Sequence, residues 1–390
     1  MNLTTTQQAF FALVRTGLWI DVKGNSYGKQ GEASPIALDL EYDWGEIYQL
    51  AEDQSVVGLV ATGIETVQDA WFQLHGSEML PRKYVLKFIG NTLHLEQKNR
   101  AMNKFMARLI RRLRERDVHA LLIKGHGIGQ CYAKPSWRIC GDIDLLLDAD
   151  NYETAKKLLL PLAQKIETED MSLMHQGMTV MDMTIELHGT LHSRLSKRIE
   201  REIDNAQRRC LVDGEVRVWH NGKTDIFLPD ANNDVIFIFT HILHHFFIDG
   251  VGLRQICDWC RLLWTFRDTL DVPLLEQRLR KMGLMSEWKA FAAYAVGWLG
   301  MPVEAMPFYD ARYKLKGDRI MALVYESGNF GKKLRPEHPK DSVLGKVKMS
   351  LHKLHNFARV TNVFPLDSVK FCCHFIVDGV TKKTKTNEEI

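Results

Sequence analysis

The stretch from Arg138 to Leu147 constrains this chain more than any other, because it places two aspartates in a run that otherwise reads as a buried β-strand. Side chains on a strand point alternately to its two faces. Asp142 and Asp144 therefore share one face, and the apolar residues between and after them share the other. Two adjacent carboxylates repel each other unless a cation neutralises them. Mg²⁺ suits such a pair, because it takes one or two carboxylates from the protein and completes its shell with water and substrate phosphates.

Two further strand-like segments flank this one. Residues 118–123 read as a strand that ends at a Lys124-Gly125 turn, where glycine permits close approach of the backbone to a ligand. Residues 181–188 alternate in the same way and carry Glu186 between two apolar residues. Asp182 is expected on the same strand face and is the fallback third carboxylate. The sequence thus predicts two further strands, one of which carries acidic side chains.

The order of these segments resembles the nucleotidyltransferase superfamily of the DNA polymerase β type, and within it the poorly characterised bacterial family NTP_transf_5. The matching segments are Lys124-Gly125, Arg138, Gly141-Asp142-Ile143-Asp144-Leu145-Leu146, Glu186-Leu187-His188, 253–258 and 328–331, so the resemblance covers most of the chain. It implies an α+β fold in which a small mixed β-sheet core is flanked by helical N-terminal and C-terminal regions. It also implies transfer of a nucleoside monophosphate from an NTP to an acceptor hydroxyl.

The resemblance further implies roles for individual side chains. Asp142, Asp144 and Glu186 would be the catalytic and metal-binding carboxylates, with Mg²⁺, or Mn²⁺ in its place, held against the triphosphate. Glu186 has two open roles, which are to complete a second metal position or to take the proton of the acceptor hydroxyl. His188 would contact the nucleotide or orient Glu186 by a hydrogen bond. The expected nucleotide-binding residues are Lys124, Gly125, His126, Arg138, Gly141 and His188.

The turn after the first strand departs from the superfamily pattern, because His126 follows Gly125 where serine or glycine is common. Lys124, His126 and backbone N–H groups of the turn are the expected phosphate donors in its place. Arg138 offers a planar fork that binds phosphate through two parallel hydrogen bonds. Its alternative role is an ordinary ion pair with Glu186.

The chain divides where the apolar spacing changes. Residues 1–117 read mostly as helices, 118–228 hold the strands of the core and a helix near 151–164, 229–380 return to helices, and 381–390 read as a flexible tail. The length of 390 residues is sufficient for two or three domains. In the second helical region, Arg254 and Asp258 are four positions apart and form either a helix ion pair or part of the site.

Cysteine and histidine clusters in this second helical region are expected to pack rather than to bind metal. Cys257 and Cys260 share one apolar helix face, and the sequence offers no second pair at a zinc-finger spacing. His241, His244 and His245 interrupt the most apolar stretch, where a histidine is usually hydrogen-bonded. That stretch, 235–247, is shorter than the roughly 20 residues that a membrane-spanning helix needs.

The composition of the chain says more about its binding partners than about any reaction it catalyses. The formal charge of +3 is small, so a nucleic-acid partner is not expected, and the arginines of 108–116 alternate with leucines as on a solvated helix face. Seven cysteines without a secreted spacing, and no signal-like start, favour the cytoplasm and no membrane association.

We therefore expect a soluble Mg²⁺-dependent transferase that binds ATP or another NTP and modifies a small-molecule acceptor. The alternatives are a toxin-like enzyme that modifies a protein or tRNA, and a non-catalytic nucleotide-binding protein. The modest net charge favours the small acceptor over a nucleic acid. The sequence specifies neither the base of the NTP nor the oligomeric state.

Overall fold

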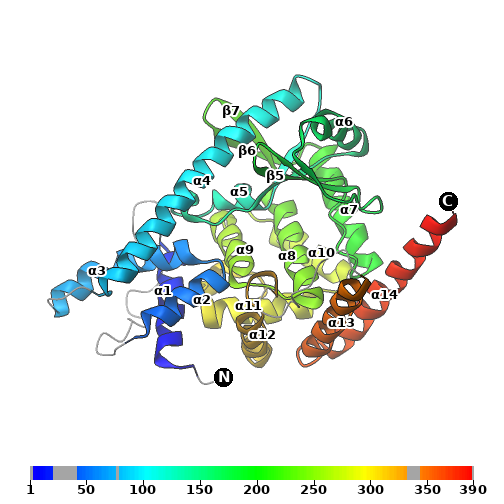
Figure 1. The fold of residues 1–390 in the computed structure, drawn as a ribbon. Helices are drawn as coiled ribbons and strands as arrows, with labels where there is room; N and C mark the ends of the chain where they lie inside the picture. Colours follow the sequence, from blue (N-terminus) through cyan, green and yellow to red (C-terminus); the bar gives the residue numbers. More distant parts are fainter. Residues whose placement is uncertain (1–2, 21–41, 76–78, 332–342, 389–390) are drawn as a thin grey trace.

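The computed structural model describes residues 3–20, 42–75, 79–331 and 343–388, and a small mixed sheet is flanked by helices from both ends of the chain (Figure 1). The fold is α+β, which confirms the class expected from the sequence. The N-terminal helices are α1 (Thr5–Leu18), α2 (Trp44–Asp53), α3 (Val57–His75) and α4 (Arg82–Arg114). In Figure 1, α4 runs from these helices along the sheet, so it links the two parts of the molecule.

The main sheet of the described residues has the strand order β1-β2-β5-β4-β3. Its strands are β1 (Leu121–Ile123), β2 (Asp142–Leu146), β3 (Lys165–Ile166), β4 (His175–Val180) and β5 (Met183–His188). β2 and β5 are parallel, whereas the other neighbours are antiparallel. The helices between and after these strands are α5 (Gly125–Gly129), α6 (Ala149–Leu159) and α7 (Lys197–Leu211), and a separate hairpin consists of β6 (Val216–Asn221) and β7 (Thr224–Pro229).

The C-terminal part is helical. Its helices are α8 (Ala231–Ile248), α9 (Leu253–Phe266), α10 (Val272–Met282), α11 (Met285–Leu299), α12 (Lys314–Ser327), α13 (Val343–Val360) and α14 (Pro365–Glu388). Short 3-10 helices occupy Pro135–Trp137, Leu160–Leu162, Val303–Ala305, Ala311–Tyr313 and Asn329–Gly331. Among the described residues, no helix combines the length and the apolar character that crossing a membrane requires.

The two faces of the sheet pack against different parts of the chain. Ile143 and Leu145 of β2 and Ile185 and Leu187 of β5 are fully buried in an apolar cluster with residues of α4 and α6. The acidic side chains of the same strands point the other way, toward α8 and α9. This alternation confirms the strand pattern that the sequence predicted for the aspartate pair.

The N-terminal and C-terminal helices share a second apolar core. The rings of Phe11 and Trp298 lie 5.8 Å apart across this core. Cys257 and Cys260 are buried in it as free thiols, which confirms that they pack against apolar neighbours. Because both ends of the chain contribute to one core, α8 and α9 are packed against other helices and are held in position beside the sheet.

Two segment limits differ from the sequence expectation. β5 begins at Met183 and not at 181, because Met181 and Asp182 form a turn with φ angles of +51° and +63°. Asp182 is exposed in that turn, so the expectation that it shares the strand face of Glu186 was wrong. Helix α14 extends to Glu388 and includes most of the segment expected as a flexible tail.

Candidate active site

The three carboxylates singled out by the sequence line one cavity. Asp142 and Asp144 lie on β2, and Glu186 is the direct neighbour of Asp144 on the parallel strand β5. The cavity has a volume of about 290 Å³ and is bounded by the sheet on one side and by α8 and α9 on the other. Its lining residues are Lys124, Gly125, Arg138, Gly141, Asp142, Asp144, Glu186, Ile238, His241, Ile242, His245, Arg254, Gln255 and Asp258.

Lys124 brings a positive charge to this acidic cavity. Its Nζ lies 3.2 Å from Oδ1 of Asp144. Lys124 has a φ of +53°, which is rare for a residue with a side chain, and Gly125 follows at +30°. Burial lowers the pKa of Lys124, but the charges of Asp144, Glu186 and Asp142 outweigh burial and raise it. The ammonium group is therefore held in its charged form, facing the carboxylates.

The two aspartates of β2 ionise very differently. The charge of Asp144, together with burial, raises the pKa of Asp142 to about 6. Burial also opposes ionisation of Asp144, but the Lys124 ammonium and a hydrogen bond with His188 outweigh it and lower the pKa of Asp144. At Asp142 repulsion from the neighbouring carboxylates and burial outweigh the nearby Lys124 and Arg254, whereas at Asp144 Lys124 and His188 prevail.

Glu186 contacts two histidines. Its Oε2 lies 3.3 Å from Nε2 of His175 on β4 and 3.5 Å from Nε2 of His188. The same His188 nitrogen lies 2.8 Å from Oδ1 of Asp144. Burial opposes ionisation of Glu186, but hydrogen bonds with His175 and His188 prevail and lower its pKa well below the usual range. Glu186 is thus an ionised carboxylate bridged to Asp144 through His188.

Arg138 is already paired in this structure. Its guanidinium donates to both carboxylate oxygens of Asp258 on α9, at 2.8 and 2.6 Å, and both side chains are buried. The Asp258 carboxylate also accepts a hydrogen bond from Tyr132. The fork that the sequence suggested for phosphate therefore ties the segment before β2 to α9. The guanidinium of Arg138 therefore pairs with Asp258 and not with Glu186, the partner that the sequence suggested.

Two other expected nucleotide-binding residues differ in position. Gly141 lines the cavity, and a Cβ atom there would meet no atom within 4 Å, so the backbone is open to a ligand. His126 is buried outside the cavity lining. Burial, with the nearby charges of Arg138 and Lys98, lowers the pKa of His126 to about 4, so its imidazole is neutral.

Sequence reasoning missed several residues of this site. His175 was not considered, because it lies on a strand whose pairing with β5 the sequence did not reveal. His241 and His245 were assigned to packing, yet they line the cavity from α8. Their spacing of four residues on one helix is the signal that they share a face. The side-chain amide of Gln255, buried in the cavity wall, has no hydrogen-bond partner among the described residues.

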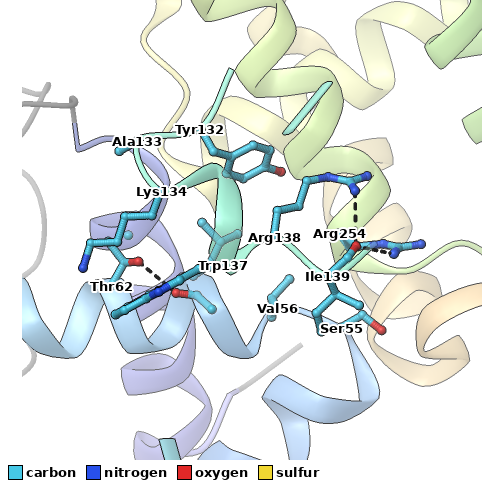
Figure 2. A pocket seen from close by; sticks show the side chains of 13 residues that line it. Ser55, Val56, Thr62, Tyr132, Ala133, Lys134, Trp137, Arg138, Ile139 and Arg254 are labelled. Atoms are coloured by element: carbon cyan, nitrogen blue, oxygen red, sulfur yellow. Dashed lines mark hydrogen bonds between the residues drawn. The ribbon is translucent and has the colours of Figure 1, made fainter. Parts of the chain in front are cut away.

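A second cleft lies beside Arg138 and is lined by Tyr132, Lys134 and Trp137 among others (Figure 2). Its volume is about 20 Å³, which is room for about one water molecule. Arg138 and Arg254 line both this cleft and the larger cavity, and both donate hydrogen bonds to the carbonyl oxygen of Ile139, at 3.2 and 2.9 Å. This cleft is too small for a nucleotide, so the carboxylate-lined cavity is the candidate site.

Carboxylates grouped with a lysine beside an open backbone form the kind of site that binds metal ions and phosphates. The family comparison agrees with this class: the NTP_transf_5 family, described as an uncharacterised nucleotidyltransferase, matches residues 41–300. The chain belongs to this family, as its sequence motifs indicated, and the match includes every residue that lines the cavity. Comparison with curated proteins and with solved structures finds no match.

Proposed function

We propose that the protein is an Mg²⁺-dependent enzyme that transfers a nucleoside monophosphate from an NTP to a hydroxyl of a small-molecule acceptor. Membership of a nucleotidyltransferase family supports nucleotidyl transfer in general. The observation that carries the more specific proposal is the convergence of Asp142, Asp144 and Glu186 with Lys124 on one cavity.

The donor set fits Mg²⁺. Carboxylate oxygens are the protein ligands that this ion prefers. The raised pKa of Asp142, about 6, reflects repulsion from Asp144 that a bound divalent cation would relieve. Asp142 and Asp144 would hold the ion, which when bound supplies charge stabilisation to phosphoryl oxygens during in-line displacement.

The other residues have distinct tasks in this proposal. Lys124 would exchange its contact with Asp144 for a phosphate oxygen, as a mobile point charge. Glu186 is a weak general base, because its pKa is far below neutral pH, so holding a cation suits it better than taking a proton. The amide of Gln255 can donate to and accept from the base or the acceptor, because neither of its polar atoms is paired among the described residues.

The dimensions of the cavity support a small acceptor. At about 290 Å³ it lies just below the roughly 300–1,000 Å³ of typical ligand-binding sites. Its walls come from the sheet and from α8 and α9, so a bound molecule contacts both parts of the chain.

Calorimetry with each of the four NTPs tests the proposal. In the presence of Mg²⁺ the wild type should bind one or more NTPs, and chelation of the metal should abolish binding. The Asp142→Ala/Asp144→Ala variant should not bind, whereas Asp182→Asn should bind normally, because Asp182 is exposed outside the cavity. Gln255→Leu should keep Mg²⁺ binding and change the preference among NTPs or acceptors. Failure of the wild type to bind any NTP would contradict the proposal.

A further inference from the structure

The side of Glu186 that faces β4 forms a group of metal-ligating atoms that includes two imidazoles. Single ligand atoms of His175, Glu186 and His188 all lie within 4.8 Å of one another. His175 and His188 are direct neighbours in the antiparallel pairing of β4 and β5, and their rings lie 4.7 Å apart. Asp144 lies beside this group and contacts it through His188, whose Nε2 is 2.8 Å from Oδ1 of Asp144.

The spacing of these atoms, which are joined by hydrogen bonds in this structure, is also compatible with a shared ion. N–H···O hydrogen bonds prefer about 2.7–3.2 Å. The contacts of Glu186 with His175 and His188 are longer, at 3.3 and 3.5 Å. Adjacent ligands of an ion with bonds of about 2.1 Å are separated by roughly 3.0 Å in octahedral and roughly 3.4 Å in tetrahedral coordination. Small side-chain rotations would therefore bring these atoms to bonding distance of one ion.

The chemistry of the ligands selects the kind of ion. Imidazole nitrogen suits Zn²⁺, Fe²⁺ and other transition metals, whereas Mg²⁺ favours oxygen. The carboxylate of Glu186 offsets part of the charge of a divalent cation. His175 is about 30% exposed at its side chain, so an ion can enter from solvent without unfolding the sheet.

We propose that His175, Glu186 and His188 form a second metal position that takes a divalent transition-metal ion, beside the Mg²⁺ position of Asp142 and Asp144. This inference deepens the proposed function, on which it rests, because it specifies the metal of the same site. Glu186 is shared between the cavity and the two histidines, so it connects the two positions. His175 then acts as a metal ligand that the sequence motifs do not include.

Electron paramagnetic resonance with Mn²⁺, in the absence of any nucleotide, tests the inference. The wild type should retain one bound Mn²⁺ in a large excess of Mg²⁺, and its spin-echo signal should show modulation from ¹⁴N nuclei. His175→Ala should weaken this Mn²⁺ binding about tenfold or more and reduce the ¹⁴N modulation. His175→Gln is a second variant, for use if the alanine variant does not fold.

A matched control is His220→Ala, which removes an exposed histidine that also contacts a carboxylate on a strand, Asp225. Its Mn²⁺ binding should equal that of the wild type. Three outcomes would overturn the inference. Mg²⁺ displaces all bound Mn²⁺, the wild type lacks ¹⁴N modulation, or His175→Ala weakens Mn²⁺ binding no more than the control His220→Ala does. The NTP titration remains a separate measurement, so NTP binding without a nitrogen-ligated Mn²⁺ refutes this inference alone. A nitrogen-ligated Mn²⁺ without NTP binding refutes the proposed function alone.

Discussion

The buried ion pair between Arg138 and Asp258 provides a test of whether Arg138 serves the fold or the phosphate. Two hydrogen bonds join the guanidinium to the carboxylate, and less than a tenth of either side chain is exposed. Asp258→Asn leaves the guanidinium buried without a compensating charge. Removing one partner of a buried pair costs about 3–5 kcal/mol, and because asparagine still accepts one hydrogen bond we expect about 3 kcal/mol.

Urea unfolding monitored by tryptophan fluorescence measures this loss. The matched control is Glu276→Gln, which breaks an exposed pair with Arg280 of similar length, 2.6 Å, and should cost less than about 1 kcal/mol. The double variant Arg138→Met/Asp258→Leu should recover most of the stability, because apolar residues of similar size often replace buried pairs without loss. If Asp258→Asn costs no more than Glu276→Gln, the structural role of Arg138 is refuted. If a stable double variant loses NTP binding, Arg138 contacts the phosphates of the NTP in addition to its role in the fold.

Three further predictions concern other parts of the molecule. Burial and the Asp367 carboxylate raise the pKa of Glu287 to about 8, so the wild type loses stability as pH rises from 4.5 through 8. Glu287→Gln should therefore be more stable than the wild type at pH 7, by up to about 3 kcal/mol in urea unfolding, and this gain should vanish below pH 4.5. A Cβ at Gly63 would lie 2.2 Å from the carbonyl oxygen of Leu13, so Gly63→Ala should destabilise the packing of α1 on α3 by about 1–3 kcal/mol, and a normal thermal midpoint would contradict that close approach. Lys124→Met should weaken NTP binding by roughly 10- to 100-fold in calorimetry, the value of about 1.5–3 kcal/mol for one charged hydrogen bond, and unchanged affinity would remove Lys124 from the phosphate contacts.

The acidic face of the site was predictable because its signal is local. The two-residue period of β2 places Asp142 and Asp144 on one face without any knowledge of the distant chain, whereas Glu186 joins them through the β2–β5 pairing, which the family resemblance implied. Asp142, Asp144 and Glu186 accordingly line one cavity, as expected. The apolar face of the same strands was predictable for the same reason, and Ile143 lies in the core.

The histidine and arginine contacts were not predictable, because they depend on pairing between separate segments. His175 reaches Glu186 only through the antiparallel register of β4 and β5. The turn that sets this register contains Met181 and Asp182 at positive φ, without the glycine that usually marks a tight hairpin. Arg138 and Asp258 are 120 positions apart, so no periodicity connects them.

The origin of the cavity walls has a consequence for how the protein is made. The carboxylates and Lys124 precede α8 and α9 in the chain by many residues, and the cavity needs both groups. During synthesis from the N-terminus, the acidic strands leave the ribosome first and at that stage have no opposite wall. A nascent chain can enclose a ligand in this cavity only after α9 has emerged, so ligand binding would report on completion of the helical part.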